Sequence, residues 1–180
     1  MPRSKRKQKR SGNCWENKNE RDPTNSDLWG CAFIMNKLQK GDYEICKDSA
    51  DQFLYVSKWC MEEGRYLTDT FYPFAVNIAF ACELYIKAIM IYRSPSDEFS
   101  SGHDLLDLYQ ELPPNDATAI ESLFSNKYKK TDIRTFLRQN RKAFPDWRYA
   151  MEKGVSIDIS GFEAFSHALV EQIRIMEGKP

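Results

Sequence analysis

Histidine and glycine are scarce in this sequence, and its cysteines are not arranged as metal ligands. The chain has two histidines, and its five cysteines, at positions 14, 31, 46, 60 and 82, include no CxxC pair. Because zinc sites use closely spaced cysteine and histidine ligands, we expect no metal ion. The eight glycines are scattered rather than gathered in a phosphate-binding loop, and no G-x-S-x-G or H-E-x-x-H motif is present. The sequence therefore predicts no cofactor and none of the enzyme classes that these motifs mark.

The sequence also lacks strand patterns, a signal peptide and an uncharged membrane span. No stretch alternates between apolar and polar residues over more than five positions, so we expect no strand beyond a short extended piece at residues 155–159. The basic N-terminus is followed by polar rather than apolar residues, unlike a signal peptide. The longest apolar run, residues 71–93, is interrupted by Glu83 and Lys87. We therefore predict a cytoplasmic protein with reduced cysteines that does not enter a membrane.

Charge is balanced over the whole chain but unevenly distributed along it. The chain has 26 basic and 26 acidic residues, and residues 1–10 contain six Lys or Arg and no acid, which leaves 20 basic against 26 acidic residues in the remainder. Residues 1–27 are polar without periodicity, so we expect a disordered basic tail. Such a tail either contacts RNA, DNA or an acidic partner through charge, or only keeps the protein soluble. Residues 28–180 are expected to form a single helical domain.

The apolar stretch at residues 71–93 is expected to be the central helix of that domain. A helix that is apolar nearly all round has neighbours on most sides. It nevertheless carries Glu83 and Lys87, which lie on one face four residues apart in the favourable order for an ion pair. Because unpaired buried charges are costly, we expect these two residues either to line a site or to form a buried or half-buried polar cluster that reaches another helix through Arg148 or His103.

Turn residues and apolar spacing predict further helices on both sides of the central one. Apolar residues recur at helical spacing in each of these stretches, so we expect the aromatic residues and leucines at these positions, Trp59 among them, to belong to the core. Turn or capping residues stand at most of the helix ends. Thr68 or Thr70 can cap the central helix, with Pro73 in its first turn, and Thr131 can cap a later one. The predicted helices span about residues 27–38, 43–63, 103–112, 115–126, 131–141, 144–153 and 161–176. The predicted fold class is all-α.

Three short pieces of the sequence, taken in their order and spacing, resemble the HEPN superfamily. They are the helix FYPFAVNIAFACELYIKAIMI with its E-x-x-x-K pair, then SGHDLLDLYQEL, then FPDWRYAMEKG. The resemblance covers about residues 43–176. It implies an antiparallel helical bundle of the kind found in ribonucleases, toxin–antitoxin pairs and phage-defence systems.

The ribonuclease motif of that superfamily is absent from this chain. HEPN ribonucleases carry R-x(4–6)-H on a late helix, where the Arg and His of two subunits form one metal-independent site. Arg148 has no His at that distance beyond it, and His167 is preceded at that distance by residues 160–162, none of which is Arg. Nine residues separate Arg93 from His103. The resemblance therefore implies a non-catalytic or divergent member.

Six residues are candidates for a functional site, and each also has a structural interpretation. Glu83 can orient His103 or act as an acid or base, and it can equally form a structural ion pair. His103 can transfer protons, cap its helix or bond a neighbouring carboxylate. Arg148 can bind phosphate, stack on an aromatic ring or pair with Glu152 four residues on. The candidates are His103, Glu83 and Arg148 as catalytic residues, and Lys87, Tyr149 and Asn77 as ligand-binding residues, with Asn77 alternatively a satisfied interior amide.

If the chain has a functional polar site, we expect it where the start of the 103–112 helix meets the middle of the 71–93 helix and the 144–153 segment, with His103, Glu83 and Arg148 as its members. His103 is expected beside free backbone N–H groups at a helix N-terminus, which favour anions. Together with Arg148, this arrangement suits a phosphate-bearing ligand such as RNA or a nucleotide.

Three functional interpretations follow. The leading one is a HEPN-like protein, non-catalytic or divergent, that binds RNA, a nucleotide or a protein partner in phage defence or a toxin–antitoxin system. The second is a metal-independent ribonuclease with a rearranged site built from Glu83, His103 and Arg148. The third is a structural module that forms a homodimer through its helix faces. Convergence of the three residues in one solvent-reachable cleft favours the second interpretation, whereas a sealed or scattered arrangement favours the other two.

Overall fold

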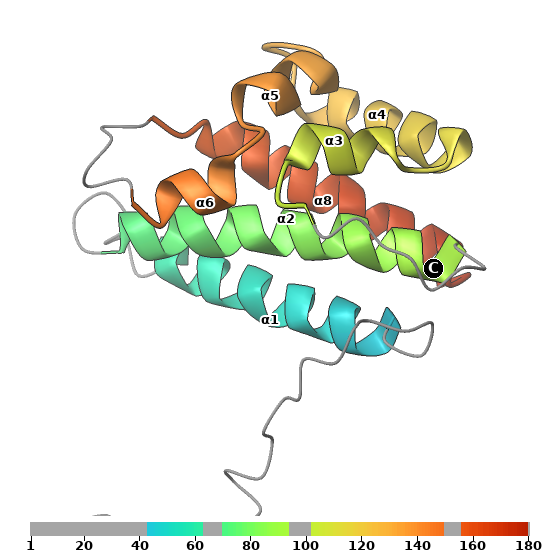
Figure 1. Cartoon of the computed structure of the whole chain (residues 1–180), viewed down its shortest axis with the longest axis horizontal. Coiled ribbons are helices and arrows are strands. Elements are labelled where there is room, and N and C mark those ends of the chain that lie inside the picture. The colour runs from blue at the N-terminus through green and yellow to red at the C-terminus, as the bar shows by residue number, and fades with distance from the viewer. Residues whose placement is uncertain (1–42, 63–69, 94–101, 150–155, 180) are drawn as a thin grey trace, which may run out of the picture. The chain divides into compact units, whose positions relative to one another are not determined.

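The chain folds into packed α-helices, as the spacing of its apolar residues predicts. The computed structural model describes residues 43–62, 70–93, 102–149 and 156–179, and every regular element within these ranges is a helix. The predicted tail at residues 1–27 and the predicted helix at residues 27–38 lie outside the described residues. The described helices are α1 (Tyr43–Glu62), α2 (Phe71–Arg93), α3 (Leu105–Gln110), α4 (Pro114–Lys127), α5 (Ile133–Gln139), α6 (Ala143–Trp147) and α8 (Ile159–Met176), as Figure 1 shows.

Helix α2 holds more buried residues than any other described helix. It packs against α1, α8, α6 and α3, so it has neighbours on most of its surface (Figure 1). The helix is long and apolar enough to cross a membrane, but 72% of that stretch is buried inside the domain. A nearly all-apolar helix of this kind is what the centre of a helical domain requires.

Helix α1 packs along α2 and leaves part of its apolar surface uncovered by the described residues. Ala50 and Leu54 face the core, and Phe53 makes an edge-on ring contact with Phe80 of α2. Trp59 is 51% exposed and Tyr55 is 72% exposed. The expectation that aromatic residues at helical spacing belong to the core is therefore wrong at Trp59. Because a helix that contacts one main neighbour buries only one stripe, its other apolar positions remain outside.

A buried carboxylate joins the end of α2 to α4 and α8. Asp116 is 2% exposed. It accepts hydrogen bonds from Arg93 Nε and Nη2, both at 3.0 Å, and from Gln172 Nε2 at 2.7 Å. The bidentate geometry is the strong form of an arginine–carboxylate pair. This polar contact fixes the relative position of three helices that are otherwise held by apolar packing.

The N-caps of three helices are aspartates, and for one of these helices the sequence suggested Thr131 instead. Asp104 caps α3, Asp132 caps α5 and Asp158 caps α8, and each side chain accepts a backbone N–H of the first turn. The predicted cap of α5 at Thr131 is therefore wrong by one residue. Helix α8 begins at Ile159, two residues before the predicted start. Thr70 precedes α2, but its hydroxyl donates to the Cys60 carbonyl at 2.9 Å, and Pro73 lies in the first turn as predicted.

Candidate functional site

Glu83 and Lys87 form a buried ion pair in the middle of α2. The carboxylate of Glu83 is fully buried, and Lys87 is 9% exposed. Lys87 Nζ lies 2.7 Å from Glu83 Oε1. The favourable order of the two residues on one helix face accounts for this pair. The prediction that the two residues form a buried polar cluster is confirmed.

The cluster reaches beyond α2 through His103. Nδ1 of His103 lies 2.9 Å from the same Glu83 Oε1 that accepts from Lys87. Because a carboxylate can only accept, Nδ1 carries the proton, and Nε2 of a neutral ring is then an acceptor. The His103 side chain is 55% exposed. One buried carboxylate therefore orients a ring that solvent reaches from the outside.

The backbone before α3 holds His103 in place. Asp104, the next residue, accepts from the N–H groups of Leu106 and Asp107. Its other carboxylate oxygen accepts from Arg141 Nε at 2.6 Å, and Leu105 N donates to the Arg141 carbonyl at 2.7 Å. These bonds tie the start of α3 to the segment between α5 and α6. His103 therefore extends from a well-anchored turn.

The start of α3 has no backbone N–H groups available for an anion. The N–H of Leu105 donates to Arg141, those of Leu106 and Asp107 donate to the Asp104 side chain, and that of Leu108 donates to the Asp104 carbonyl. The Asp104 carboxylate also brings negative charge to this end. The expectation of a helix N-terminus that attracts anions is therefore wrong, and so is the helix-capping interpretation of His103. An anion bound here would depend on side chains.

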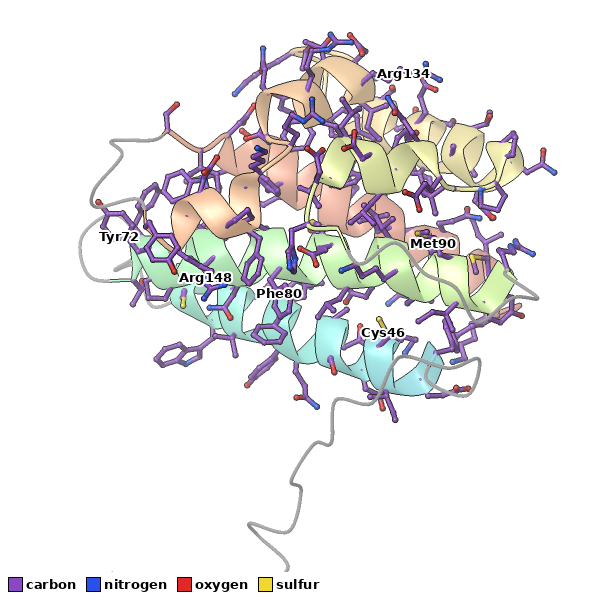
Figure 2. All side chains as sticks on the ribbon, in the orientation of Figure 1. Cys46, Tyr72, Phe80, Met90, Arg134 and Arg148 are labelled. Carbon is purple, nitrogen blue, oxygen red and sulfur yellow. The ribbon has the colours of Figure 1, made fainter. Side chains whose placement is uncertain are left out.

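Phe144 of α6 connects His103 to Arg148. Its ring stacks on Phe80 of α2 with centroids 4.2 Å apart, and it lies 5.8 Å from the His103 ring. The Arg148 guanidinium lies 5.5 Å from the same ring, in cation–π geometry, and Figure 2 shows Arg148 beside Phe80. The predicted meeting of α2, the start of α3 and the 144–153 segment is thus confirmed for the described part of that segment.

Arg148 does not join the ion pair of α2. Among the described residues it has no carboxylate partner, and its cation contacts the rings of Phe144 and Tyr149. It is exposed at the C-terminal end of α6. The predicted link from Glu83 to a neighbouring element therefore runs through His103 and not through Arg148. This leaves the guanidinium edge accessible to solvent.

The remaining predicted residues differ in their exposure. Tyr149 is 52% exposed, whereas Asn77 is half-buried and its Nδ2 donates to the Pro73 carbonyl at 2.6 Å within α2. Tyr72, which the sequence did not single out, is 46% exposed, and its ring lies 6.4 Å from that of Trp147 on α6. We refer to Tyr72, His103, Phe144, Arg148 and Tyr149 as the α6 face.

The α6 face combines donors for phosphate with exposed aromatic rings. Arg148 is a permanent planar cation, and aromatic rings of this kind stack on nucleic-acid bases. Strand cleavage by a 2′-hydroxyl requires both a base and an acid. His103 can act as one of these, but the described residues that contact its ring, Glu83 and Phe144, supply no separate second group. The described part of this face therefore offers contacts for a bound ligand and one imidazole held by a carboxylate.

A second polar group, which the sequence did not indicate as a site, lies on α8. His167 Nε2 is 3.9 Å from Glu171, which also accepts from Arg174 Nη1 at 2.8 Å. Burial and the charge of Lys127 lower the pKa of His167 below its ordinary value of 6.5, with Glu171 acting in the opposite direction. The one signal in the sequence is a histidine followed by Glu and Arg on the flank of an otherwise apolar helix, which is too common to indicate a site.

Comparison of the chain with family models, with curated proteins and with solved structures gave no match. Within the described ranges, no three His, Cys, Asp or Glu side chains are placed to hold a metal ion together. Function must therefore be inferred from the geometry of these two groups.

Proposed function

We propose that this protein is a HEPN-like antiparallel bundle that binds a phosphate-bearing ligand, single-stranded RNA or a nucleotide, on the α6 face without cleaving it. Arg148 would contact a phosphate, His103 would donate to or accept from the ligand through Nε2, and Tyr72 and Tyr149 would stack on bases. The role of Glu83 is then positional, because it holds the His103 ring, and Lys87 balances its charge.

The observation that carries this proposal is the pairing of His103 Nδ1 with the buried Glu83 carboxylate at 2.9 Å. A surface histidine without such a partner would rotate among several conformations. Here the ring is held by a carboxylate that is itself fixed inside α2, and its second nitrogen is free to meet a ligand. Arg148 contacts the same Phe144 ring that lies beside His103. Preorganised polar groups of this kind reduce the entropy lost on binding.

The test is the affinity of a short single-stranded RNA for the wild type and for Arg148→Ala and His103→Ala, measured by fluorescence anisotropy at physiological salt. We expect each substitution to weaken binding by roughly tenfold to a hundredfold, as expected for the loss of one charged hydrogen bond. Arg138→Ala is the matched control, because Arg138 is an exposed arginine on α5, outside the α6 face.

Two further features of the measurement make it specific to the α6 face. Circular dichroism must first establish that both variants are folded. If wild type, Arg148→Ala and His103→Ala then bind RNA with equal affinity, the α6 face is not the binding site, and the basic residues of the first ten positions become the remaining nucleic-acid contact. A loss with Arg138→Ala equal to that with Arg148→Ala would indicate a general charge effect.

One observation favours a second candidate function, a metal-independent ribonuclease. A histidine hydrogen-bonded to a carboxylate is the arrangement that orients a general base in many hydrolytic sites. Incubation of the purified protein with RNA in the presence of a metal chelator tests it directly. Cleavage that disappears in His103→Ala, with binding retained, would favour the ribonuclease, whereas intact RNA under conditions of saturated binding supports the non-catalytic proposal.

A further inference from the structure

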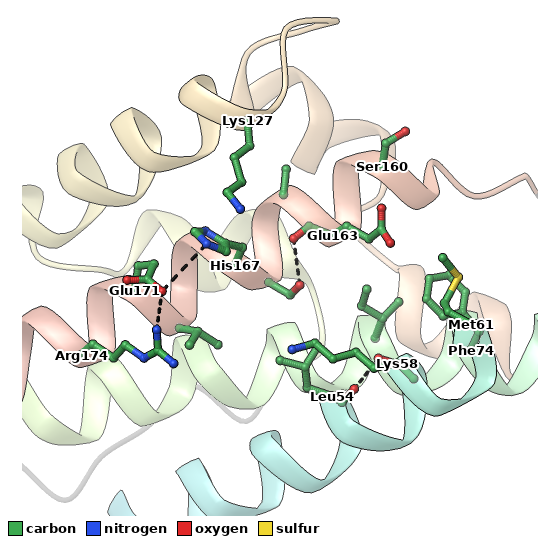
Figure 3. Close-up of a pocket in the computed structure, with 15 residues that line it drawn as sticks. Leu54, Lys58, Met61, Phe74, Lys127, Ser160, Glu163, His167, Glu171 and Arg174 are labelled. Carbon is green, nitrogen blue, oxygen red and sulfur yellow. Dashed lines mark hydrogen bonds and ion pairs between the residues drawn. The ribbon is translucent and has the colours of Figure 1, made fainter. Parts of the chain in front are cut away.

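A pocket of about 670 Å³ lies between α1 and α8, and no residue of the α6 face lines it. Its lining comes from α1, α2, α8 and the last residue of α4, and Figure 3 shows the side chains. The volume falls within the range of sites that bind small organic molecules. The apolar part of the lining includes Leu54, Met61, Phe74 and Val170.

Charged side chains around this apolar lining come from three helices. Lys58 on α1, Lys127 at the end of α4 and Arg174 on α8 are the cations, and Glu163 and Glu171 are the anions. Glu171 is already bound to Arg174 at 2.8 Å. Lys58 and Lys127 have no ion-pair partner among the described residues. The pocket therefore has two cations available to a ligand.

The two lysines border the pocket from different helices. Figure 3 shows Lys127 extending from α4 toward His167, and Lys58 extending from α1 on the other side. Both lysines act on the His167 ring electrostatically, in the direction that disfavours a positive charge. Nδ1 of His167 is buried and has no hydrogen-bond partner within the described part of the chain. The region between these side chains thus has an excess of positive charge and unused hydrogen-bonding capacity.

We propose that this pocket binds a small molecule that has an apolar body and one anionic oxygen-bearing group. The apolar body would contact Leu54, Met61 and Phe74, and the anionic group would lie between Lys58 and Lys127. Burial of the apolar body supplies most of the affinity. The two lysines are exposed and have no ion-pair partner among the described residues, so they favour an anion over a neutral molecule of the same shape through a charge attraction that solvent partly screens.

A pair of fluorescent probes of the same shape tests this selection. The anionic probe is 8-anilinonaphthalene-1-sulfonate, and the neutral probe is N-phenyl-1-naphthylamine, which has the same rings without the sulfonate. We expect the wild-type protein to bind the anionic probe more tightly than the neutral one. We expect added salt to lower the affinity for the anionic probe and to leave the affinity for the neutral probe unchanged. The full-length protein is titrated with each probe, and fluorescence gives both affinities.

Substitutions assign the probe to the pocket. In the double variant Lys58→Gln/Lys127→Gln we expect the affinity for the sulfonate probe to fall roughly tenfold, which is near the upper end of what two exposed ion pairs contribute together. The affinity for the neutral probe should not change. Lys129→Gln/Lys142→Gln removes the same charge from two exposed lysines outside the pocket lining, and it should leave both affinities as in the wild type. Val170→Trp narrows the pocket, so it should lower the affinity for both probes.

Each outcome decides the proposal. A loss confined to the anionic probe in Lys58→Gln/Lys127→Gln, together with a loss of both probes in Val170→Trp, supports it. Equal sulfonate affinity in the wild type and Lys58→Gln/Lys127→Gln overturns it, and so does unchanged binding of both probes in Val170→Trp. Because both lysines are exposed, the double variant Lys58→Gln/Lys127→Gln is expected to fold. It therefore tests the preference for an anionic group even if Val170→Trp does not fold.

Discussion

At the scale of single residues, Glu83 divides its two carboxylate oxygens unequally. Oε1 accepts from both Lys87 and His103, whereas Oε2 is buried without a hydrogen-bond partner among the described residues. A buried carboxylate with an unsatisfied oxygen is costly to hold, so its remaining contacts with Lys87 and His103 matter to the fold. Because both contacts of the cluster are made to Glu83, we expect a substitution of Glu83 to disturb the cluster more than a substitution of Lys87 or His103.

Glu83→Ala is expected to lower the free energy of unfolding by about 3–5 kcal/mol, because Lys87 is left buried without its partner. Urea denaturation followed by circular dichroism measures this loss. Glu44→Ala, an exposed glutamate on α1, is the control and should change stability by less than about 0.5 kcal/mol. A silent Glu83→Ala would mean that the ion pair contributes nothing to the fold.

His167 provides a pH-dependent contribution to stability whose sign follows from its environment. Lys127, Lys58 and Arg174 disfavour its cation, Glu171 favours it, and burial with these cations keeps its pKa below 6.5 in the folded protein. The unfolded chain therefore binds more protons near that pH. The contribution is fully present above the unfolded pKa and is lost as pH falls below it toward the folded pKa.

We therefore expect the wild type to lose more stability than His167→Gln when pH falls from about 7.5 to about 5, because the variant has no proton to bind there. Denaturation midpoints at several pH values give the two curves. The difference should appear below pH 6.5 and stay constant above it. Parallel curves over the whole interval would show that His167 titrates alike in both states.

The candidate residues were predictable only where local spacing determines the contact. Glu83 and Lys87 could be paired from the sequence because four residues on a helix bring them together. His103 was one of two predicted partners, and the choice between His103 and Arg148 depended on how α6 lies on α2. His167 and the two lysines of the pocket were missed, because they come from three helices whose packing the sequence does not reveal.

At the scale of the helices, Gly161 sets how closely α8 approaches α5. A Cβ at this position would lie 2.8 Å from Phe136 Cδ2 and still closer to Cε2. Phe136 is buried among aromatic rings, including those of Phe124 and Phe162, so its ring has little freedom to move. The close contact therefore requires a residue without a side chain.

Gly161→Ala is expected to destabilise the protein by about 1–2 kcal/mol. Overpacking costs about 1–3 kcal/mol, and this outweighs a gain in helix propensity of at most about 1 kcal/mol. Thermal unfolding measures the change, and Phe136→Leu tests the cause. If the clash is responsible, the double variant is more stable than the sum of the two single losses predicts. A stabilised Gly161→Ala would show that Phe136 moves aside freely.

Helix existence could be predicted from the sequence more reliably than helix ends or exposure. The bounds of α2 match the apolar run, because that stretch is buried nearly all round. The starts of α3, α5 and α8 were misplaced, since Ser, Thr and Asp compete as caps within a few residues. Trp59 was assigned to the core because its spacing fits a helix, but spacing does not reveal whether a second neighbour covers that side of α1.

At the scale of the whole molecule, charge is separated along the chain. The first ten residues carry six basic side chains and no acid, and the rest of the chain has an excess of six acidic residues. Nucleic acid would be attracted by the first group and repelled on average by the second. A nucleic acid bound on the α6 face would therefore be repelled on average by the negative net charge of the rest of the chain. Its binding there would depend on the local contacts of Arg148 and His103 and on stacking.

Removal of residues 1–25 separates these two contributions. Their sequence has almost no apolar content to bury, so we expect the melting temperature to change by less than about 2 °C, within the shift that a few tenths of a kcal/mol produce. RNA affinity should fall and depend less steeply on salt, because phosphate contacts of the basic residues are lost. The remaining affinity should still decrease in Arg148→Ala. A drop in melting temperature of several degrees would instead mean that this segment packs against the helices, and a truncated protein without RNA affinity would assign binding to the basic residues alone.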